Sequence, residues 1–513
     1  MIVFSTSRRN LIGVIVLLMA TGWVVAAGAD PPTYENTTDI PPEVTTPDKV
    51  PTSLGTLEFF DGVPTGDTIE KVYDFVDRAR AVEVFINMTP AVSMYNIRKG
   101  QRNLGHTKCN QIVIAEQMGD SKPLVLTWNN TSLYTWGFLD LKKDGPTVIE
   151  IPPDVLGILD DMYFRYITDM GAAGPDRGKG GKYLILPPGY EGDVPDGYYV
   201  FESKTYGVWN FMRGYVRDSV EAAAKNIKEN LKVYPLSRKD NPPRMEFLNM
   251  SGRGDYQTIA PNDFSFYEDV HALVQEEADG WADPELLGQC RAIGIQKGKP
   301  FAPDARMKKI LTEAVAVANA TARAIFWYER DKSEFLYEGS YWKRGYPGNN
   351  YQFLKNEGMG GRNMDARTSF YYFATINTPA MAMKLVGAGS QYAWGYLDSN
   401  GNYLDGSKTY RMNIPKDPPA EKFWSVCVYD PQTRSMLQTD QTYPSKQSQR
   451  DKLITNDDGS IDLYFGPTAP AGKEANWTQT VPGKGWFCLL RLYSPTEAWF
   501  DKTWRPGEIE LVN

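Results

Sequence analysis

The sequence predicts a mainly β protein that also contains helices. Short runs of β-branched and aromatic residues, separated by Asn, Gly and Pro, occur in residues 111–215 and again in residues 372–513. Apolar stripes at helical spacing occupy the region between them, about residues 216–335. The 45 glycines and 35 prolines are typical of turn-rich β structure rather than of a helical array.

A chain of 513 residues is too long for one ordinary core, so we expect two or three domains. The predicted organisation has five parts. They are a cleaved signal peptide at 1–29, a flexible lead-in at 30–66, an N-terminal β-rich domain at 67–215, a helical middle segment and connection at 216–371, and a C-terminal β-sandwich domain at 372–513.

The first 29 residues have the layout of a secretory signal peptide. Arg8 and Arg9 precede an apolar run from Leu11 to Val25, and small residues follow before Asp30. A transmembrane anchor is the alternative, but a run of about fifteen residues is short for a membrane crossing. We therefore expect a periplasmic or secreted protein, exported by the Sec or the twin-arginine route, with no stable membrane anchor after cleavage.

Composition predicts the structure of residues 30–66, and residue spacing predicts a helix after them. Residues 30–66 are rich in Pro and Thr with little apolar content, which predicts flexibility. A capping box at Asp67 to Glu70 predicts a helix that ends before Pro90. The β-type runs then begin at Gln111.

Three further helices and a set of hairpins follow. Amphipathic spacing predicts helices within 219–231, 262–279 and 305–330, the last capped by Asp304. Beyond residue 372, Asn-Gly and Asp-Gly pairs separate strand-like runs at 421–430, 460–465 and 485–493. This spacing suits a sandwich or jelly roll.

Charge and cysteine content exclude several classes of function. The chain carries 55 Lys and Arg against 63 Asp and Glu, so we expect no nucleic-acid partner. The four cysteines are widely spaced without a CxxC pair, which argues against a disulfide scaffold and a zinc site. Cys427 and Cys488 lie in strand-like runs and could either pair or remain two buried thiols.

Four long segments are similar to a known family, namely residues 159–190, 286–311, 408–441 and 474–504. They resemble the tandem proteins whose N-terminal half is the domain of unknown function DUF1254 and whose C-terminal half is DUF1214. The resemblance implies two β-sandwich or jelly-roll-like domains joined by a helical segment, in exported bacterial "cell envelope" proteins. It implies no settled reaction, although a phosphatase-like activity has been proposed within the family.

The main candidate site is a glycine-rich loop with the charged strand before it. Asp161, Arg165 and Asp176 are the candidate catalytic residues. Successive glycines can direct backbone N–H groups at an anion, and neighbouring cations would assist them. The candidate ligand-binding residues here are Arg177, Lys179, Lys182 and Tyr206. The alternative is that these charges pair with the aspartates and brace the loop, and Asp160 with Asp161 could also hold a divalent cation.

Two other groups are candidates for ligand binding. Asp365 and Arg367 stand where the helical segment meets the last domain, so they could line a cleft or form a structural ion pair. Asn476 and Trp477 could hydrogen-bond and stack on a sugar, or pack in a sandwich core. Lys484, Trp486 and Arg491 belong to the same group.

The usual catalytic signatures are missing from the sequence. His106 and His271 are the only histidines, and no HExxH, GxSxG or phosphate-binding P-loop motif occurs. We identify no cofactor and no metal ligands. The expected function is binding of an anionic small molecule, with hydrolysis of a phosphate ester as a further step. The alternatives are a non-catalytic carbohydrate-binding envelope protein and a carboxylate-based glycosidase or lyase.

Overall fold

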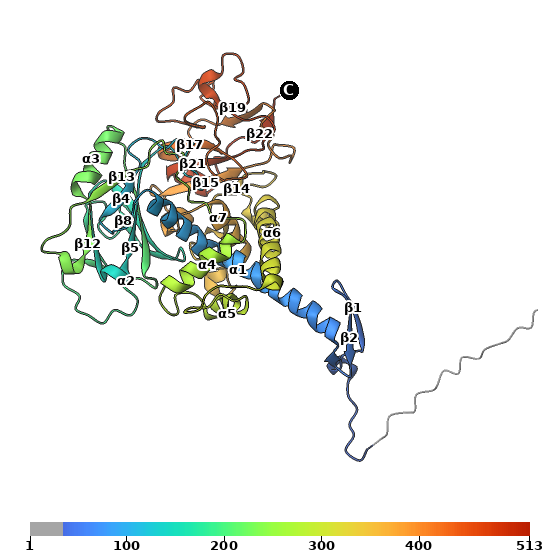
Figure 1. Ribbon diagram of the computed structural model, residues 1–513. Coiled ribbons are helices and arrows are strands. Elements are labelled where there is room, and N and C mark those ends of the chain that lie inside the picture. The colour runs from blue at the N-terminus through green and yellow to red at the C-terminus, as the bar shows by residue number, and fades with distance from the viewer. Residues whose placement is uncertain (1–33, 513) are drawn as a thin grey trace, which may run out of the picture. The chain divides into compact units, whose positions relative to one another are not determined.

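The computed structural model describes residues 34–512 (Figure 1), so the signal peptide predicted at 1–29 lies outside the described residues. The described chain divides into two compact units, one ending at Lys71 and one starting at Val72. The first unit contains a three-stranded antiparallel sheet where the composition predicted a flexible lead-in. Its strands are β1 (Lys49–Thr52), β2 (Gly55–Phe60) and β3 (Val63–Pro64). Asp61 and Gly62 both adopt positive φ, which makes the tight β2–β3 hairpin turn.

Helix α1 (Gly66–Asn103) continues through Pro90, so the prediction that it ends before this proline was wrong. Pro90 has no N–H to donate to the carbonyl of Ile86. Burial overrides this loss, because Val84, Met88 and Val92 on either side are fully buried. Among residues 34–512, no helix has the length and apolar character that crossing a membrane requires.

The N-terminal sandwich consists of two sheets in the second unit. The larger sheet has the order β13 (Glu246–Asn249), β4 (Gln111–Ile114), β5 (Leu133–Asp140), β11 (Gly207–Gly214), β7 (Val155–Asp161), β8 (Tyr166–Gly171). The smaller sheet has the order β10 (Tyr199–Glu202), β9 (Gly181–Leu186), β6 (Thr147–Ile151), β12 (Lys232–Pro235). Ile149, Ile185 and Met212 are among the residues that pack between them, and α3 (Val220–Asn230) adds Ile227 to the same core. A short helix, α2 (Leu141–Asp144), follows β5.

The C-terminal sandwich also consists of two sheets. The larger has the order β14 (Lys343–Arg344), β15 (Ser390–Gly395), β21 (Phe487–Pro495), β17 (Ala420–Tyr429), β18 (Ser445–Gln447). The smaller has the order β20 (Trp477–Gln479), β19 (Ile461–Gly466), β16 (Tyr410–Ile414), β22 (Ile509–Leu511). Trp424, Trp486 and Leu490 pack in the core between them, together with Trp499 of α9 (Glu497–Phe500).

The remaining helices form a central core with the outer faces of both larger sheets (Figure 1). These helices are α4 (Ser265–Glu276), α5 (Pro284–Ala292), α6 (Ala305–Trp327), α7 (Met364–Phe373) and α8 (Pro379–Ala382). Trp136 and Phe211 face this core from one sheet, and Trp394 and Leu489 face it from the other. The predicted mainly β class with helices is therefore confirmed.

All four cysteines are buried free thiols. In the pairing of β17 with β21, Cys427 lies opposite Leu489 while Cys488 lies opposite Val428. This offset of one residue puts the two thiols on opposite faces of the sheet. Cys427 faces the central core and Cys488 faces the sandwich core, so the alternative of two buried thiols describes the structure.

A buried carboxyl on β8 links the N-terminal sandwich to the C-terminal half. Asp169 accepts hydrogen bonds from the hydroxyls of Thr378 (2.6 Å) and Tyr166 (3.2 Å). Thr378 is also the N-cap of α8. Burial raises the pKa of Asp169 from 3.8 to about 6, against the opposing effect of these two hydrogen bonds.

We expect Asp169→Asn to remove part of the pH dependence of stability. Between pH 4 and 6 the unfolded chain releases the Asp169 proton while the folded chain retains it, so stability falls as pH rises through this window. The decline from this group is about 3 kcal/mol at most. Urea unfolding at pH 4, 5 and 6 would measure it. Asp458→Asn, at an exposed turn, is the control. An unchanged slope in the Asp169 variant would contradict the prediction.

Candidate functional site

A cavity of about 850 Å³ opens beside the turn between β7 and β8. We call it the arginine cleft, because Arg165, Arg362 and Arg367 line it. Its walls come from several parts of the chain: α1 near Pro90, the β7–β8 turn, the end of β10, the start of α5, residues 351–353, the start of α7 and Asn377. Three of the predicted site residues, Asp161, Arg165 and Arg367, thus share one cavity.

The β7–β8 turn is held by Asp161. One oxygen of its carboxylate accepts the backbone N–H groups of Tyr163 (2.8 Å) and Arg165 (3.0 Å). The other accepts Nε of Arg165 at 2.6 Å, and the same guanidinium donates to the carbonyl of Trp281. Burial raises the pKa of Asp161, and the charge of Arg165 opposes this shift. Phe164 between them has a φ of 56°, so the carboxylate stabilises a strained turn.

Arg367 on α7 reaches across the cleft to α1. Its Nη2 donates to Oδ1 of Asn87, and the Asn87 side chain donates to Glu83. The Asn87 carbonyl also accepts the hydroxyl of Tyr163 (2.5 Å), so the strand turn and both helices meet here. Nε of Arg367 and Oε1 of Gln289 are buried and have no partner among the described residues. Two residues that line the cleft thus each have one unsatisfied polar atom, but both atoms are buried behind its surface.

Arg362 precedes the N-terminus of α7. Asn363 is the N-cap, and its side chain accepts the N–H of Ala366 at 3.0 Å. Arg362 donates to the carbonyl of Gln352, and no carboxylate of the described chain lies within ion-pair distance of it or of Arg367. Although the residue as a whole is exposed, partial desolvation of its guanidinium, followed by the neighbouring charge of Arg367, lowers the pKa of Arg362, and the charge of Asp283 opposes this shift. Two guanidiniums without an ion-pair partner among the described residues therefore lie close together.

The cleft is also lined by four carboxylates, from Asp161, Glu202, Asp283 and Glu285. Three of them already accept hydrogen bonds from the protein. Asp161 pairs with Arg165, Asp283 caps α5, and Glu202 accepts the N–H of Gly189. Arg362 and Arg367 also donate hydrogen bonds, but only to the neutral oxygens of Gln352 and Asn87, so neither forms an ion pair within residues 34–512.

The glycine loop after β8 is closed around its own aspartate. Asp176 is buried and accepts the N–H groups of Gly171 (2.8 Å) and Gly180 (3.1 Å) and the hydroxyl of Tyr183 (2.5 Å). Further backbone N–H groups, including that of Gly178, donate to carbonyls inside the loop. The amides that could have formed an anion nest are thus used internally, and Asp176 does not line the arginine cleft.

The cations of this loop point into solvent. Arg177, Lys179 and Lys182 are all exposed, and Lys182 lies 3.4 Å from Glu150. None of the three lines the arginine cleft. Lys182 pairs with Glu150 and not with an aspartate, and within residues 34–512 Arg177 and Lys179 form no ion pair, so the alternative in which these cations pair with the aspartates is not seen either.

Two other predicted ligand-binding residues also lie outside the cleft. The backbone N–H of Tyr206 donates to Glu277, and Nζ of Lys142 lies 5.6 Å from the centroid of its ring. Asp365 forms an ion pair with Arg330 at 2.8 Å and lines a second charged groove of about 540 Å³, which shares Arg362 and Met364 with the arginine cleft. Asp365 and Arg367 are two residues apart in the sequence, but on α7 Arg367 lines the arginine cleft and Asp365 lines the other groove.

The predicted sugar-binding pair supports the smaller C-terminal sheet. The Asn476 side chain is buried and bridges the backbone of Ile454 to that of Asp462. The indole N–H of Trp477 donates to the carbonyl of Gly466. The polar atoms that a sugar would require are therefore already used.

Sequence reasoning missed Arg362, Asn87 and Gln289. Asn87 lies 280 residues from Arg367 in the chain, so no local pattern links them. Arg362 carried the clearest signal, because Gly-Gly-Arg-Asn stands directly before a capped helix.

The histidines and the acidic residues are the side chains that could form a metal site. His106 is buried, its Nε2 accepts the N–H of Phe138, and burial lowers its pKa to about 4. Within residues 34–512, no group of three His, Cys, Asp or Glu side chains is arranged to hold a metal ion.

We expect Asp176→Ala to destabilise the protein by about 3 kcal/mol, because it leaves three buried donors without their charged acceptor. Equilibrium urea unfolding measures this loss. Lys179→Ala, in the same loop but exposed, should change stability by less than about 0.5 kcal/mol. Equal effects of the two substitutions would contradict the structural role of Asp176.

Two family models match the chain, one after the other. Protein of unknown function (DUF1254) matches residues 109–235, and Protein of unknown function (DUF1214) matches residues 389–497. No curated protein matches this chain.

Two solved structures are similar to this chain. The VPA0106 protein from Vibrio parahaemolyticus has 18% identity and a TM-score of 0.51, with 85% of this chain and 100% of that chain covered. At this identity the likeness supports the fold alone. An uncharacterized protein from Burkholderia cenocepacia has 10% identity and a TM-score of 0.37, with 88% of this chain and 91% of that chain covered. Both family models match in the order that the sequence motifs predict, so this chain is similar to the proteins in which DUF1254 and DUF1214 follow one another.

Proposed function

We propose that this protein binds an anionic small molecule in the arginine cleft. The observation that carries the proposal is the pair of guanidiniums from Arg362 and Arg367, which have no carboxylate partner among the described residues. Guanidinium groups bind phosphate and carboxylate through paired N–H donors. The N-terminus of α7 beside Arg362 favours negative charge in the same place.

The size and lining of the cleft support a ligand larger than a single ion. Its volume of about 850 Å³ lies within the range of sites for small organic molecules. Tyr163, Tyr351 and Tyr371 add aromatic surface beside the arginines. We infer a ligand with an apolar or ring-shaped body and at least one phosphate or carboxylate group.

The contacts of Asp161 favour binding over hydrolysis. A nucleophile or general base requires a free oxygen facing the substrate. Both oxygens of Asp161 already accept hydrogen bonds from the turn and from Arg165. We therefore assign Asp161 and Arg165 to positioning the cleft wall, and we retain phosphate-ester hydrolysis as an outcome of the test.

We expect Arg362→Ala to weaken binding of phenyl phosphate by 10-fold or more, because it removes one charged hydrogen-bond donor. Arg362 is exposed, so this variant should fold normally. Arg367→Ala should have at least the same effect. Isothermal titration calorimetry at low and high salt would measure both, with weaker binding at high salt.

Arg330→Ala is the matched control, since Arg330 is an exposed arginine paired with Asp365 outside the cleft. It should leave binding within twofold of the unsubstituted protein. Equal binding by the Arg362 and Arg330 variants would refute the proposed site. Hydrolysis of p-nitrophenyl phosphate that disappears in the Arg362 variant would instead support the hydrolase.

We also propose that the protein acts after export, on the basis of the arginine pair and apolar run in its first 29 residues. N-terminal sequencing of the protein recovered from the periplasm or medium should begin at Asp30. Substitution of Ala27 and Ala29 by bulky residues should leave the precursor uncleaved. Recovery of the intact chain in the cytoplasm, with no extracytoplasmic form, would contradict this proposal.

A further inference from the structure

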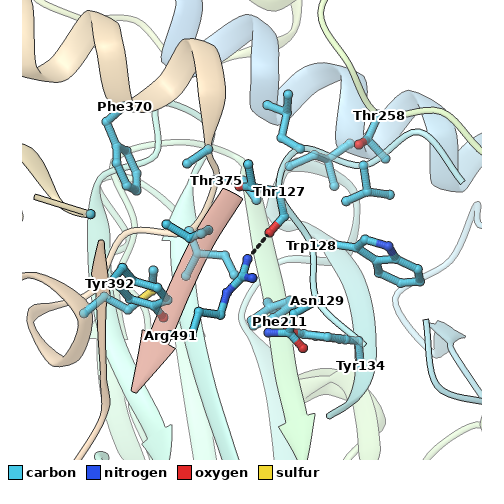
Figure 2. A pocket seen from close by; sticks show the side chains of 18 of the residues that line it. Thr127, Trp128, Asn129, Tyr134, Phe211, Thr258, Phe370, Thr375, Tyr392 and Arg491 are labelled. Carbon is cyan, nitrogen blue, oxygen red and sulfur yellow. Dashed lines mark hydrogen bonds between the residues drawn. The ribbon is translucent and has the colours of Figure 1, made fainter. Parts of the chain in front are cut away.

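A second, smaller cavity of about 60 Å³ lies in the central core between the two larger sheets (Figure 2). We call it the interior pocket. Strands β5 and β11 line it from one sheet, and β15 and β21 line it from the other. It shares no lining residue with the arginine cleft.

Each sheet contributes a buried arginine to this pocket. Arg213 on β11 is 9% exposed, and Arg491 on β21 is 3% exposed. Arg213 lies opposite Tyr134 on the neighbouring strand, and Arg491 lies opposite Tyr392. Figure 2 shows the Arg491 guanidinium in the middle of the pocket, between Tyr392 and Thr127.

Several polar atoms of the pocket have no partner. Nη2 of Arg491 donates to the carbonyl of Thr127 at 2.5 Å, but its Nη1 is buried without a partner among the described residues. Nε of Arg213 and the hydroxyls of Tyr392 and Tyr256 also lack a partner within hydrogen-bond distance in the described chain, although, against the lowering effect of burial, Tyr392 lies close enough to Arg213 to raise the pKa of that arginine. Within residues 34–512, neither arginine lies within ion-pair distance of a carboxylate.

A guanidinium group stays protonated in proteins, so both arginines bring a positive charge into a low-dielectric interior. Aromatic contacts compensate only in part. The Arg213 guanidinium lies 5.6 Å from the ring centroid of Tyr134, and that of Arg491 lies 5.6 Å from Tyr429. A bound anion would neutralise charge and satisfy the free donors.

The dimensions of the pocket limit the identity of this anion. A water-sized group needs about 10–15 Å³ of cavity volume, so a cavity of about 60 Å³ holds roughly four to six non-hydrogen atoms. Most of the lining is apolar, with Trp136, Phe211 and Trp394 among its residues. The fork of a guanidinium matches the two oxygens of a carboxylate. We propose that the interior pocket binds one small monocarboxylate of the size of acetate, enclosed within the fold.

The test uses the full chain, dialysed free of organic acids, with acetate as the probe. Because acetate binds the folded state, sodium acetate should raise the unfolding temperature saturably relative to sodium chloride at equal pH and ionic strength. Titration of ¹³C-acetate followed by NMR should show one saturable site. Equal stabilisation by chloride, or no saturable acetate signal, would overturn the proposal.

Arg491→Met should abolish the acetate response, since it removes the central donor while preserving much of the side-chain volume. If this variant fails to fold, Tyr392→Phe tests the pocket instead, because it removes only a hydroxyl that has no partner within hydrogen-bond distance among residues 34–512. We expect Tyr392→Phe to fold normally and to weaken acetate binding several-fold; an unchanged affinity would count against the pocket. The Arg362→Ala, Arg367→Ala double variant should keep the acetate response, and its loss there would assign acetate to the arginine cleft instead.

Discussion

The complete burial of strands β11 and β21 is the constraint on which the rest of the structure depends. Every residue of both strands is buried. Side chains of a strand alternate between its two faces, so each strand must supply apolar side chains to a sandwich core and to the central core. On β21, for example, Leu490 enters the sandwich core and Leu489 enters the central core. The helices are needed because the outer faces of both larger sheets would otherwise expose large aromatic surfaces.

Burial in the central core also explains why a proline inside α1 does not end the helix. Pro90 removes a hydrogen bond from α1, yet the helix continues, because apolar side chains before and after it are buried in the central core. The proline lies in the wall of the arginine cleft, and in the same turn the Asn87 carbonyl accepts the hydroxyl of Tyr163. A proline that is tolerated for packing reasons thus lies beside polar backbone at the edge of a cavity.

The sequence allowed the fold class to be predicted because strand alternation, helix periodicity and turn dipeptides are local signals. It also identified Asp161, Arg165 and Arg367, which share the cleft. The prediction of an anion site in the glycine loop was less successful. No local pattern reveals that the Asp176 side chain turns inward and accepts the backbone N–H groups of the loop. Partners that arrive from distant segments, such as Asn87 opposite Arg367, are set by the packing of helices and leave no pattern in the chain.

The arginine cleft and the interior pocket differ in the free-energy cost of lacking a bound anion. Arg362 is exposed at the arginine cleft, where water can solvate its charge, so an empty cleft is tolerable and a ligand can exchange. Arg213 and Arg491 are enclosed by aromatic side chains, so water compensates their charges poorly and an absent anion leaves donors unsatisfied. An anion in the interior pocket would therefore act on the stability of the whole fold, whereas one in the cleft would be recognised and released. Arg362 lies in the loop before α7 and Arg367 lies buried on that helix, whereas Arg213 and Arg491 both lie on fully buried strands. The proposed difference between the two sites therefore depends on the solvent exposure of Arg362.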